Sequence, residues 1–551
     1  MKHALLAGVL FCLTLIANLP AAAVGWNNDG TGDYGVDCRP PLNFDGEKGL
    51  GVRWKAKLPN WSNSSPIVIQ TAAGLRVFCV AEPLDYSPLL LCFDGDTGKE
   101  LWQRELDAVP CLPQEQQADA RALAKKCWAR NRARKALNAE AWKLYQASKA
   151  DWDARPELKR KDDGVSAEVR KKLPIELEPL LKRADEIGAI FVGIHRNHTC
   201  PSMFWSGKSA DISQDSRRLN QLGLMGSLWE EDGTWDGAAY PTPVSDGTRV
   251  WTVTMHNLYS CHDIDGKVLW QVRIPPASQW GPGQGGFSTS PILVDGKLIS
   301  CAGDFTRCLD AASGKILWEY PLTRKIDQNM AVPMAMNLPG QPYIISVNGD
   351  IYRLSDGRPM GILPGRTHDK GNNNGPIIAG DLVINLGAIQ GAGTPMDLTA
   401  HRLREQSGAV TMEKVWCIAG VTKISLTRAA WRGGRLYNGG TVVDFNTGTN
   451  VAVKLPALNP GYSGAGGILA GGYHLSWDFH NGNFLWRDLA TGLKAGEGKL
   501  PVNPADGLPL AIKYEQAIDE KWRWLGAATP FAWKDRLYIR AFDFLWCLGT
   551  P

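Results

Sequence analysis

The chain has 551 residues, of which 44% are hydrophobic and 21% charged, so it can bury a large core and is too apolar to be disordered. Its 60 basic and 56 acidic residues nearly balance, which argues against a general nucleic-acid binder. It also has 59 glycines and 22 tryptophans, a combination that favours short strands joined by tight turns over a helical protein.

Residues 1–23 have the features of a secretory signal peptide. Met1–His3 form a basic head, and Ala4–Ile16 are an apolar run shorter than the roughly 20 residues of a membrane span. Small residues follow, and we expect cleavage after Ala23. No later segment is apolar enough to cross a bilayer, so the sequence predicts a secreted or periplasmic protein. A retained membrane anchor is the alternative.

The cysteines indicate structural positions more than chemistry. Of the 12 cysteines, Cys12 lies in the signal, which leaves an odd number and therefore at least one thiol without an intrachain partner. There is no Cys-x-x-Cys pair, which argues against a cysteine zinc site. Cys301 and Cys308 are placed to face each other across a hairpin. Four cysteines recur at one place in a repeat, namely Cys92, Cys261, Cys308 and Cys547.

Three segments, 64–102, 242–270 and 290–318, repeat one pattern. Each opens on Ser-Pro or Thr-Pro, passes an Asp and a Gly-Lys turn, and ends on Leu-Trp, which predicts four short strands per copy. We expect the final Trp to be a wedge between neighbouring copies. The structural repeat residues are Asp94, Gly98, Trp102, Asp263, Gly266, Trp270, Asp310, Gly314 and Trp318.

Weaker copies follow along the rest of the chain, and together the copies predict an all-β, eight-bladed β-propeller with four-stranded antiparallel blades. The last copy, from Thr529 to Gly549, lacks its fourth strand, and residues 52–59 have the form of that strand. Pairing the two would close the ring and remove open sheet edges. Seven blades remain an alternative, because copies five to seven are irregular.

A segment without the repeat interrupts the propeller. Residues 114–152 are rich in Ala, Lys, Arg and Glu and carry an approximate helical stripe of apolar residues. Residues 114–190 have 18 basic and 13 acidic residues, a net charge of +5, and we favour a solvated helical hairpin over a contact arm for an acidic or membrane-surface partner. The expected organisation is a signal (1–23), a closing strand and first blade (24–106), a mainly helical and irregular insertion (107–234), and the remaining blades (235–551).

The pattern Asp-x-x-Thr/Ser-Gly-Lys-x-x-Trp, as in 94–102 and 310–318, resembles the pyrroloquinoline quinone (PQQ) repeat of quinoprotein-type propellers. The first three copies are a specific match, and residues 51–551 outside the insertion are compatible. The resemblance implies an eight-bladed propeller. The family includes PQQ-dependent alcohol dehydrogenases and non-catalytic relatives of the BamB type, which scaffold outer-membrane assembly, so the resemblance does not decide activity.

The dehydrogenase branch of that family implies a quinone stacked between a Trp and a vicinal disulfide, with Ca²⁺ held near a catalytic Asp. This sequence has no adjacent cysteines, no local match to the calcium ligands and no haem-attachment motif. We therefore expect no cofactor, with PQQ and Ca²⁺ as the alternative, and assign no catalytic residue.

The loops that lead into the innermost strands are rich in aromatic residues, Gly and Asn, a set that suits a sugar or a planar ligand. Two histidines, on a strand-two-to-three turn and on one such loop, join neighbouring polar residues as a candidate cluster without making a zinc site. The ligand-face candidates are Trp61, Asn63, Trp235, Tyr240, Trp280, His256, Asp304, Arg366, His368, Asp369, Asn373 and Trp524.

The leading hypothesis is a non-catalytic binding or scaffold module for a protein or glycan partner, acting through this face. A PQQ-dependent oxidoreductase of the alcohol or aldose dehydrogenase type is the first alternative. A carbohydrate-active enzyme, which needs two carboxylates across a rim groove, is the second. No nucleic-acid partner is expected, and the oligomeric state stays open.

Overall fold

A computed structural model describes residues 23–550 apart from a series of gaps. The longer gaps are residues 82–86, 157–166, 192–204, 207–213, 225–240, 275–288, 324–331, 365–375, 387–395, 422–428, 459–466 and 502–527.

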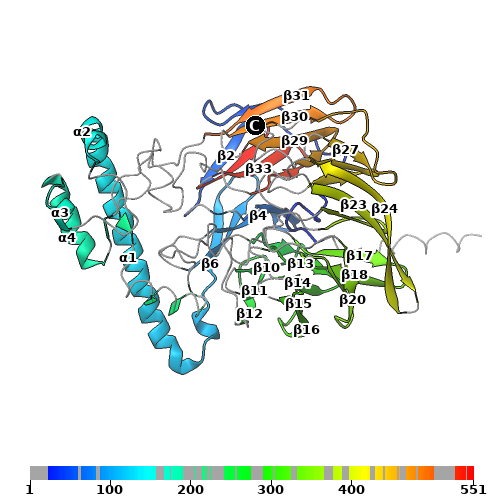
Figure 1. Ribbon diagram of the computed structural model, residues 1–551, viewed down its shortest axis with the longest axis horizontal. Coiled ribbons are helices and arrows are strands. Elements are labelled where there is room, and N and C mark those ends of the chain that lie inside the picture. Colours follow the sequence, from blue (N-terminus) through cyan, green and yellow to red (C-terminus); the bar gives the residue numbers. More distant parts are fainter. Residues whose placement is uncertain are drawn as a thin grey trace, which may run out of the picture.

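Eight antiparallel sheets follow one another in chain order around a ring (Figure 1). Blade 1 contains β3 (Ile67–Thr71), β4 (Gly74–Ala81), β5 (Leu89–Asp94) and β6 (Glu100–Glu105). Blade 2 contains β9 (Val244–Ser245), β10 (Arg249–Val253), β11 (Leu258–Asp263) and β12 (Val268–Arg273). Blade 3 contains β13 (Ile292–Val294), β14 (Lys297–Ser300), β15 (Phe305–Asp310) and β16 (Ile316–Pro321). Blade 4 contains β17 (Met334–Leu338), β18 (Gln341–Ile345), β19 (Asp350–Arg353) and β20 (Pro359–Ile362).

The second half of the ring is less regular. Blade 5 contains β21 (Ile377–Ala379), β22 (Leu382–Leu386) and the long hairpin β23 (Met396–Gln406) and β24 (Ala409–Val421). Blade 6 contains β25 (Ala430–Arg432), β26 (Arg435–Asn438) and β27 (Thr441–Asp444). Blade 7 contains β28 (Ile468–Ala470), β29 (Tyr473–Asp478), β30 (Asn483–Asp488), β31 (Lys494–Lys499) and the added strand β1 (Phe44–Asp45). Blade 8 contains β32 (Phe531–Trp533), β33 (Arg536–Ala541), β34 (Phe544–Leu548) and β2 (Val52–Lys57).

The eight-bladed propeller is therefore confirmed, and the alternative of seven blades is wrong. The predicted closure is also found, because β2 from near the start of the chain pairs antiparallel with β34, with Trp54 opposite Cys547 and Lys57 opposite Phe544. Blade 6 departs from four strands, since beyond β27 only an isolated bridge between Val443 and Asn450 is formed among its described residues.

The meander of each blade gives the ring two different faces. The turns between the first and second and between the third and fourth strands lie on one side, which we call the turn face. The connections between the second and third strands, and those leading from one blade into the next, lie on the other, which we call the loop face. Most gaps in the described chain fall in the connections of the loop face.

The repeat Trp of one blade packs on the repeat Gly of the next. The indole N–H of Trp102 donates to the carbonyl of Ile264 at 3.1 Å, and a Cβ added to Gly266 would lie 2.7 Å from the ring. Only a residue without a side chain allows this approach. The same joint is formed by Trp54 on Gly98, Trp270 on Gly314, Trp318 on Gly357 and Trp416 on Gly448.

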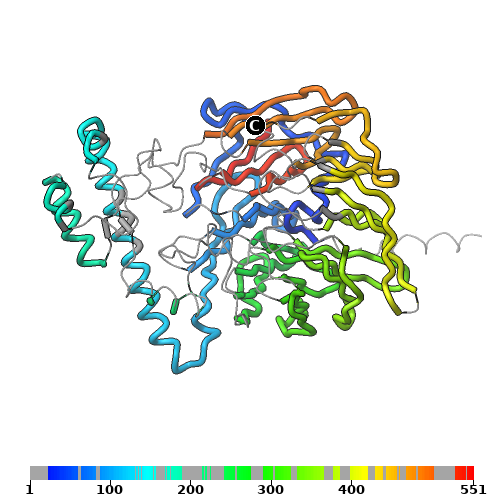
Figure 2. The backbone as a smooth tube through the Cα atoms, viewed as in Figure 1, coloured from blue at the N-terminus to red at the C-terminus, as the bar shows by residue number. Residues whose placement is uncertain are grey.

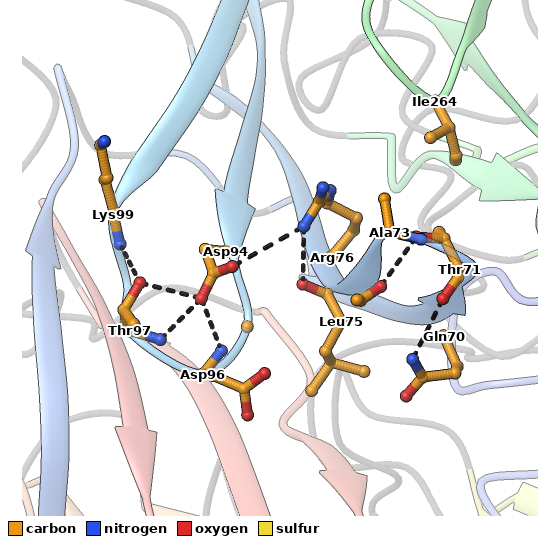
Figure 3. Close-up of polar contacts among 12 residues, drawn as sticks. Gln70, Thr71, Ala73, Leu75, Arg76, Asp94, Asp96, Thr97, Lys99 and Ile264 are labelled. Carbon is orange, nitrogen blue, oxygen red and sulfur yellow. Dashed lines mark hydrogen bonds and ion pairs between the residues drawn. The ribbon is translucent and has the colours of Figure 1, made fainter.

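The repeat Asp holds the turn that presents this Gly. The carboxylate of Asp94 accepts hydrogen bonds from the backbone N–H of Asp96 and from the backbone and hydroxyl of Thr97, at 2.8–3.1 Å (Figure 3). Asp310 accepts the equivalent bonds from Ser313, and Asp263 from the N–H of Lys267. These residues therefore shape the joints between blades.

The joint between blades 7 and 8 lacks the pair of Trp on Gly among the described residues, and the N-terminal segment fills that place. β1 pairs in parallel with β31, and the Phe44 ring lies where a Cβ on Gly498 would be, 2.1–2.3 Å away. Phe44 packs there in one cluster with Phe484 and Trp546. The N-terminal segment thus substitutes for the missing wedge.

Residues 24–39 form a strap across the central channel, which can be followed in dark blue in Figure 2. Val24 exchanges two backbone hydrogen bonds with Ser245 of blade 2. Thr31 then accepts from Trp431 of blade 6, which lies four blades away and so on the opposite side of the ring. Asp33 forms an ion pair with Arg432, and the hydroxyl of Tyr34 donates a hydrogen bond to the carbonyl of Pro530 of blade 8 at 3.2 Å. The strap was not predicted from the sequence.

The predicted helical insertion lies between blades 1 and 2, to one side of the ring (Figure 1). It contains η1 (Val109–Cys111), α1 (Gln114–Ala147), α2 (Lys149–Ala154), α3 (Ala167–Arg170), η3 (Ile175–Leu177), α4 (Glu178–Glu186) and the short pair β7 (Ile190–Phe191) and β8 (Trp205–Ser206). The first half of α1 packs against the blade 1 core, and the second half packs against α4.

Several cations of the insertion form ion pairs within it or with its flanks. Arg130 and Lys126 contact Asp215, Arg183 contacts Glu140, and Arg121 contacts Asp107. No helix in the described part of the chain is long and apolar enough to span a bilayer.

The Trp–Gly joint predicts that replacement by Ala costs much more stability at one glycine than at another of similar φ. Gly314 (φ +73°) lies under Trp270, whereas a Cβ added to Gly296 (φ +70°) would have no atom within 4 Å. We expect Gly296→Ala to cost about 1–2 kcal/mol for the left-handed backbone alone. Gly314→Ala should cost about 1–3 kcal/mol more, because the methyl group overpacks the indole. Urea unfolding of both variants measures the difference, and equal losses would contradict the joint.

Candidate functional site

All twelve ligand-face candidates predicted from the sequence lie outside the described residues. This holds for the five aromatic and asparagine candidates that precede blades 1–3, for the four in the polar loop 366–373, and for His256, Asp304 and Trp524. The structure does describe the residues from which these loops leave the propeller, and these form the base of the loop face.

Four buried hydroxyl residues join the start of four successive blades. The backbone N–H of Thr529 donates to the hydroxyl of Ser65 at 2.8 Å, and the N–H of Ser65 donates to that of Thr242 at 3.0 Å. The N–H of Thr242 in turn donates to the hydroxyl of Ser290 at 2.9 Å. We call Thr529, Ser65, Thr242 and Ser290 the hydroxyl chain, and all four are at most 3% exposed.

The hydroxyl chain has a simple local cause. Each member precedes a proline, namely Pro530, Pro66, Pro243 and Pro291. A residue before proline is held in the extended region, so its backbone N–H keeps a fixed direction at the start of the innermost strand. The repeated Ser/Thr-Pro pair was visible in the sequence, but its side-to-side bonding was not inferred from it.

Buried charged groups in blades 8 and 4 also form bonds near the points where loops of the loop face begin. Arg540, which is 1% exposed, donates to the carbonyls of Val80 and Ser64 in blade 1. Asp543 is buried beside Lys57, and Asp350 accepts from the hydroxyl of Thr323 at 2.6 Å. These charged groups are bonded to other parts of the propeller, so they hold in place the residues at which the loops begin.

Two buried histidines lie near blade joints. His262 lies on β11, and neither of its ring nitrogens has a hydrogen-bond partner among the described residues. Burial, and then the nearby Arg104 guanidinium, lower the pKa of His262 to about 4. His474 of blade 7 stacks on Tyr437 of blade 6, and burial, then Arg487, lower its pKa to about 4. Both are neutral imidazoles placed at or near blade joints.

The repeat cysteines are buried third-strand residues. Burial raises the pKa of the thiols of Cys261, Cys308 and Cys547 to about 12, and raises that of Cys92 further. All described cysteines are free, so Cys301 and Cys308 do not form the hairpin disulfide considered from the sequence. The high thiol pKa values make these residues weak nucleophiles.

The sequence lacks one part of the quinone site that the family resemblance implies. No two cysteines are adjacent anywhere in the sequence, so the vicinal disulfide of that site cannot form. Among the described residues, no group of three or more His, Cys, Asp and Glu side chains is close enough to hold a metal ion. We derive no chemistry through a quinone.

The hydroxyl chain predicts a contrast between two threonines. Thr242→Val removes the acceptor of the buried Ser65 N–H and should lower the free energy of unfolding by about 1–3 kcal/mol. Thr289 is the matched control, because its buried hydroxyl has no partner in the described structure, and Thr289→Val should be neutral or stabilising. Denaturant unfolding distinguishes the two, and equal effects would contradict the role of the chain.

The two buried histidines predict a loss of stability in mild acid. Since their pKa values fall from an ordinary 6.5 to about 4 on folding, the unfolded chain binds more protons below pH 6.5. The free energy of unfolding should then fall with pH by roughly 1.4 kcal/mol per unit for each histidine, down to about pH 4. Urea unfolding at pH 7 and 5 should show a smaller fall in His262→Phe/His474→Phe, and an unchanged fall would contradict this origin.

No protein-family model and no curated protein matches this sequence. Among solved structures, BamB from Moraxella catarrhalis is similar over 56% of this chain and 83% of its own, with 14% identity and a TM-score of 0.38. The C-terminal WD40 domain of Sif2 is similar over 56% and 79%, with 15% identity and a TM-score of 0.32. Hsv2 of Kluyveromyces lactis is similar over 44% and 71%, with 8% identity and a TM-score of 0.28. The chain is a β-propeller by its own sheet topology.

Proposed function

We propose that this chain is an extracytoplasmic, non-catalytic binding module that holds a protein or glycan partner on its loop face. The observation that carries the proposal is the hydroxyl chain, because it locks the starting points of blades 8, 1, 2 and 3 to one another. The loops leading into these four blades therefore leave one rigid base.

The sequence of each of these four loops contains a Trp, namely Trp524, Trp61, Trp235 and Trp280. Aromatic side chains offer flat faces to sugars and large contact areas to proteins at a low cost in conformational entropy. A rigid base lowers that cost further, because less freedom is lost on binding. The four tryptophans are the residues that we propose to contact the partner.

The strap supports the choice of the loop face. It crosses the channel and bonds to the innermost strands of blades 2, 6, 7 and 8. Through Val24 and Arg39 it reaches residues at the strand-one-to-two turns of blades 2 and 8, on the turn face. A partner that enters the channel is therefore expected to do so from the loop face.

The proposal predicts that Trp61→Ala/Trp235→Ala/Trp280→Ala/Trp524→Ala loses partner binding by about tenfold or more. Glycan arrays and affinity capture with crosslinking identify the partner, and titration of that partner measures the loss. The control changes Arg366, His368, Asp369 and Asn373 to Ala, since these precede blade 5, which the hydroxyl chain does not include. Equal binding by wild type and the Trp variant would refute the proposal.

Thermal unfolding with PQQ and Ca²⁺ separates binding from quinone catalysis. A cofactor that binds the folded state raises the melting temperature with its concentration. We expect no such rise, and a rise with the quinone spectrum retained after desalting would replace this proposal by the oxidoreductase alternative.

A further inference from the structure

The innermost strand of each blade has one edge paired with the second strand and the other edge facing the central channel. In an antiparallel pair, residues bonded to the partner strand alternate with residues whose N–H and C=O point away from it. A two-residue turn is closed by a bonded pair, so the residue before that pair directs its backbone groups into the channel. We call this residue the edge residue of its blade.

The strap already binds to the edge residues of three blades. The strand register makes Ser245, Trp431 and Leu469 the edge residues of blades 2, 6 and 7. Ser245 exchanges two backbone hydrogen bonds with Val24, and Trp431 donates its N–H to the strap. Leu469 donates its N–H to one strap residue and accepts a hydrogen bond from another. The channel edge of a blade can therefore hold an extended chain through its backbone groups.

Blades 3, 4 and 5 have the same kind of edge without the strap. Their edge residues are Leu293, Asn337 and Ile378, and the longer β17 of blade 4 adds Ala335. Pro342 lies opposite Asn337, and since proline has no N–H, this agrees with an unbonded pair there. In the part of the chain that the structure describes, no channel-side hydrogen bond engages the backbone of these four residues. Unpaired backbone groups along a strand edge are a template for an added strand.

The side chains of these three innermost strands favour a peptide over a glycan. β13, β17 and β21 consist of aliphatic residues, two Met and one Asn, with no charged residue. All of β13 and Ala335 are partly exposed, and Asn337 is exposed, so solvent reaches these edges. They offer a glycan a single side-chain amide, whereas an extended peptide can pair with each of their unbonded N–H and C=O groups.

We propose that an uncharged, extended peptide segment of a protein partner enters the channel from the loop face and adds as a strand to the channel edge of β17. This inference rests on the proposed binding at the loop face and assigns its partner to the proteins. Backbone hydrogen bonds at Ala335 and Asn337 supply the affinity, as they do wherever a strand is added to a sheet edge. Alternate side chains of the peptide contact the aliphatic residues of the neighbouring innermost strands.

Hydrogen–deuterium exchange of the full chain without a ligand gives the first test. The amides of Trp431 and Leu469 are bonded to the strap, so they should exchange slowly. The amides of Ala335 and Asn337 should exchange rapidly. Mass spectrometry with fragmentation resolves both pairs, and slow exchange at Ala335 and Asn337 would overturn the proposal because that edge would already be covered.

A phage-displayed library of linear seven-residue peptides, selected on the full chain, supplies the probe. We expect the selected peptides to lack charged residues and central prolines, because a proline removes a backbone donor. Synthetic copies should slow exchange at Ala335 and Asn337. Recovery of no binding peptide, or binding without this protection, would overturn the proposal.

Two substitutions at one position separate backbone from side-chain recognition. Asn337→Pro removes a channel-side donor without removing a bond to β18, and should weaken the selected peptide about tenfold. Asn337→Ala is the matched control, since it keeps the N–H and should bind as the wild type does. Circular dichroism melting checks that both variants fold. Equal affinity of the wild type and a folded Asn337→Pro would overturn the proposal, and if Asn337→Pro does not fold, the exchange at Ala335 in the wild type decides.

The variant that changes the four loop tryptophans to Ala separates this inference from the proposed function. Peptide binding that survives in that variant but is weakened by Asn337→Pro supports the channel edge and contradicts the role of the tryptophans. Binding that is lost with the tryptophans but unchanged in Asn337→Pro contradicts the channel edge and leaves the proposed function in place.

Discussion

The packing of one indole on the glycine of the next blade is the contact on which the rest of this structure depends. A blade is hydrophobic on both faces and is stable only against its neighbours. Trp102 above Gly266 and Trp270 above Gly314 set the distance between blades, and the Asp-centred turns hold those glycines in place. Because each indole N–H also donates to a carbonyl of the next blade, the joint fixes orientation as well as distance.

Closing the ring needs more than these joints, since three of them lack the pair of Trp on Gly among the described residues. The N-terminal segment compensates in three ways. β2 completes blade 8, Phe44 fills the joint between blades 7 and 8, and the strap ties blade 2 to blades 6, 7 and 8 across the channel. These contacts join residues hundreds of positions apart and can form only when the C-terminal blades are present, so closure of the ring depends on the most long-range contacts of the chain.

The same architecture separates two kinds of surface. At the loop face, buried hydroxyl residues and Arg540 hold the residues at which the loops begin. The sequences of the loops can therefore vary while their starting points stay fixed. At the outer rim, the bulge that frees each Trp for docking leaves a neighbouring residue exposed in blades 1, 2 and 3. These three blades have leucine there, while blade 8 has Arg53 in an ion pair. The bulge that the joint requires therefore leaves one residue at the surface, and the packing of the joint does not restrict which residue that is.

The sequence by itself determined the repeat and the pairing of the chain ends, because Gly98, Trp102 and their equivalents act through local spacing that recurs along the chain. It predicted eight blades but left seven open, and the sheet topology decided between them. Tertiary structure alone decided the strap, the packing of Phe44 on Gly498, the hydroxyl chain and the burial of His262. Each of these features depends on which residues contact each other across blades. Residues 24–39 have no repeat from which their contacts could be predicted. The exposure of Leu101, Leu269 and Leu317 also could not be predicted from the sequence, because only the bulge separates each leucine from the Trp that packs on the next blade.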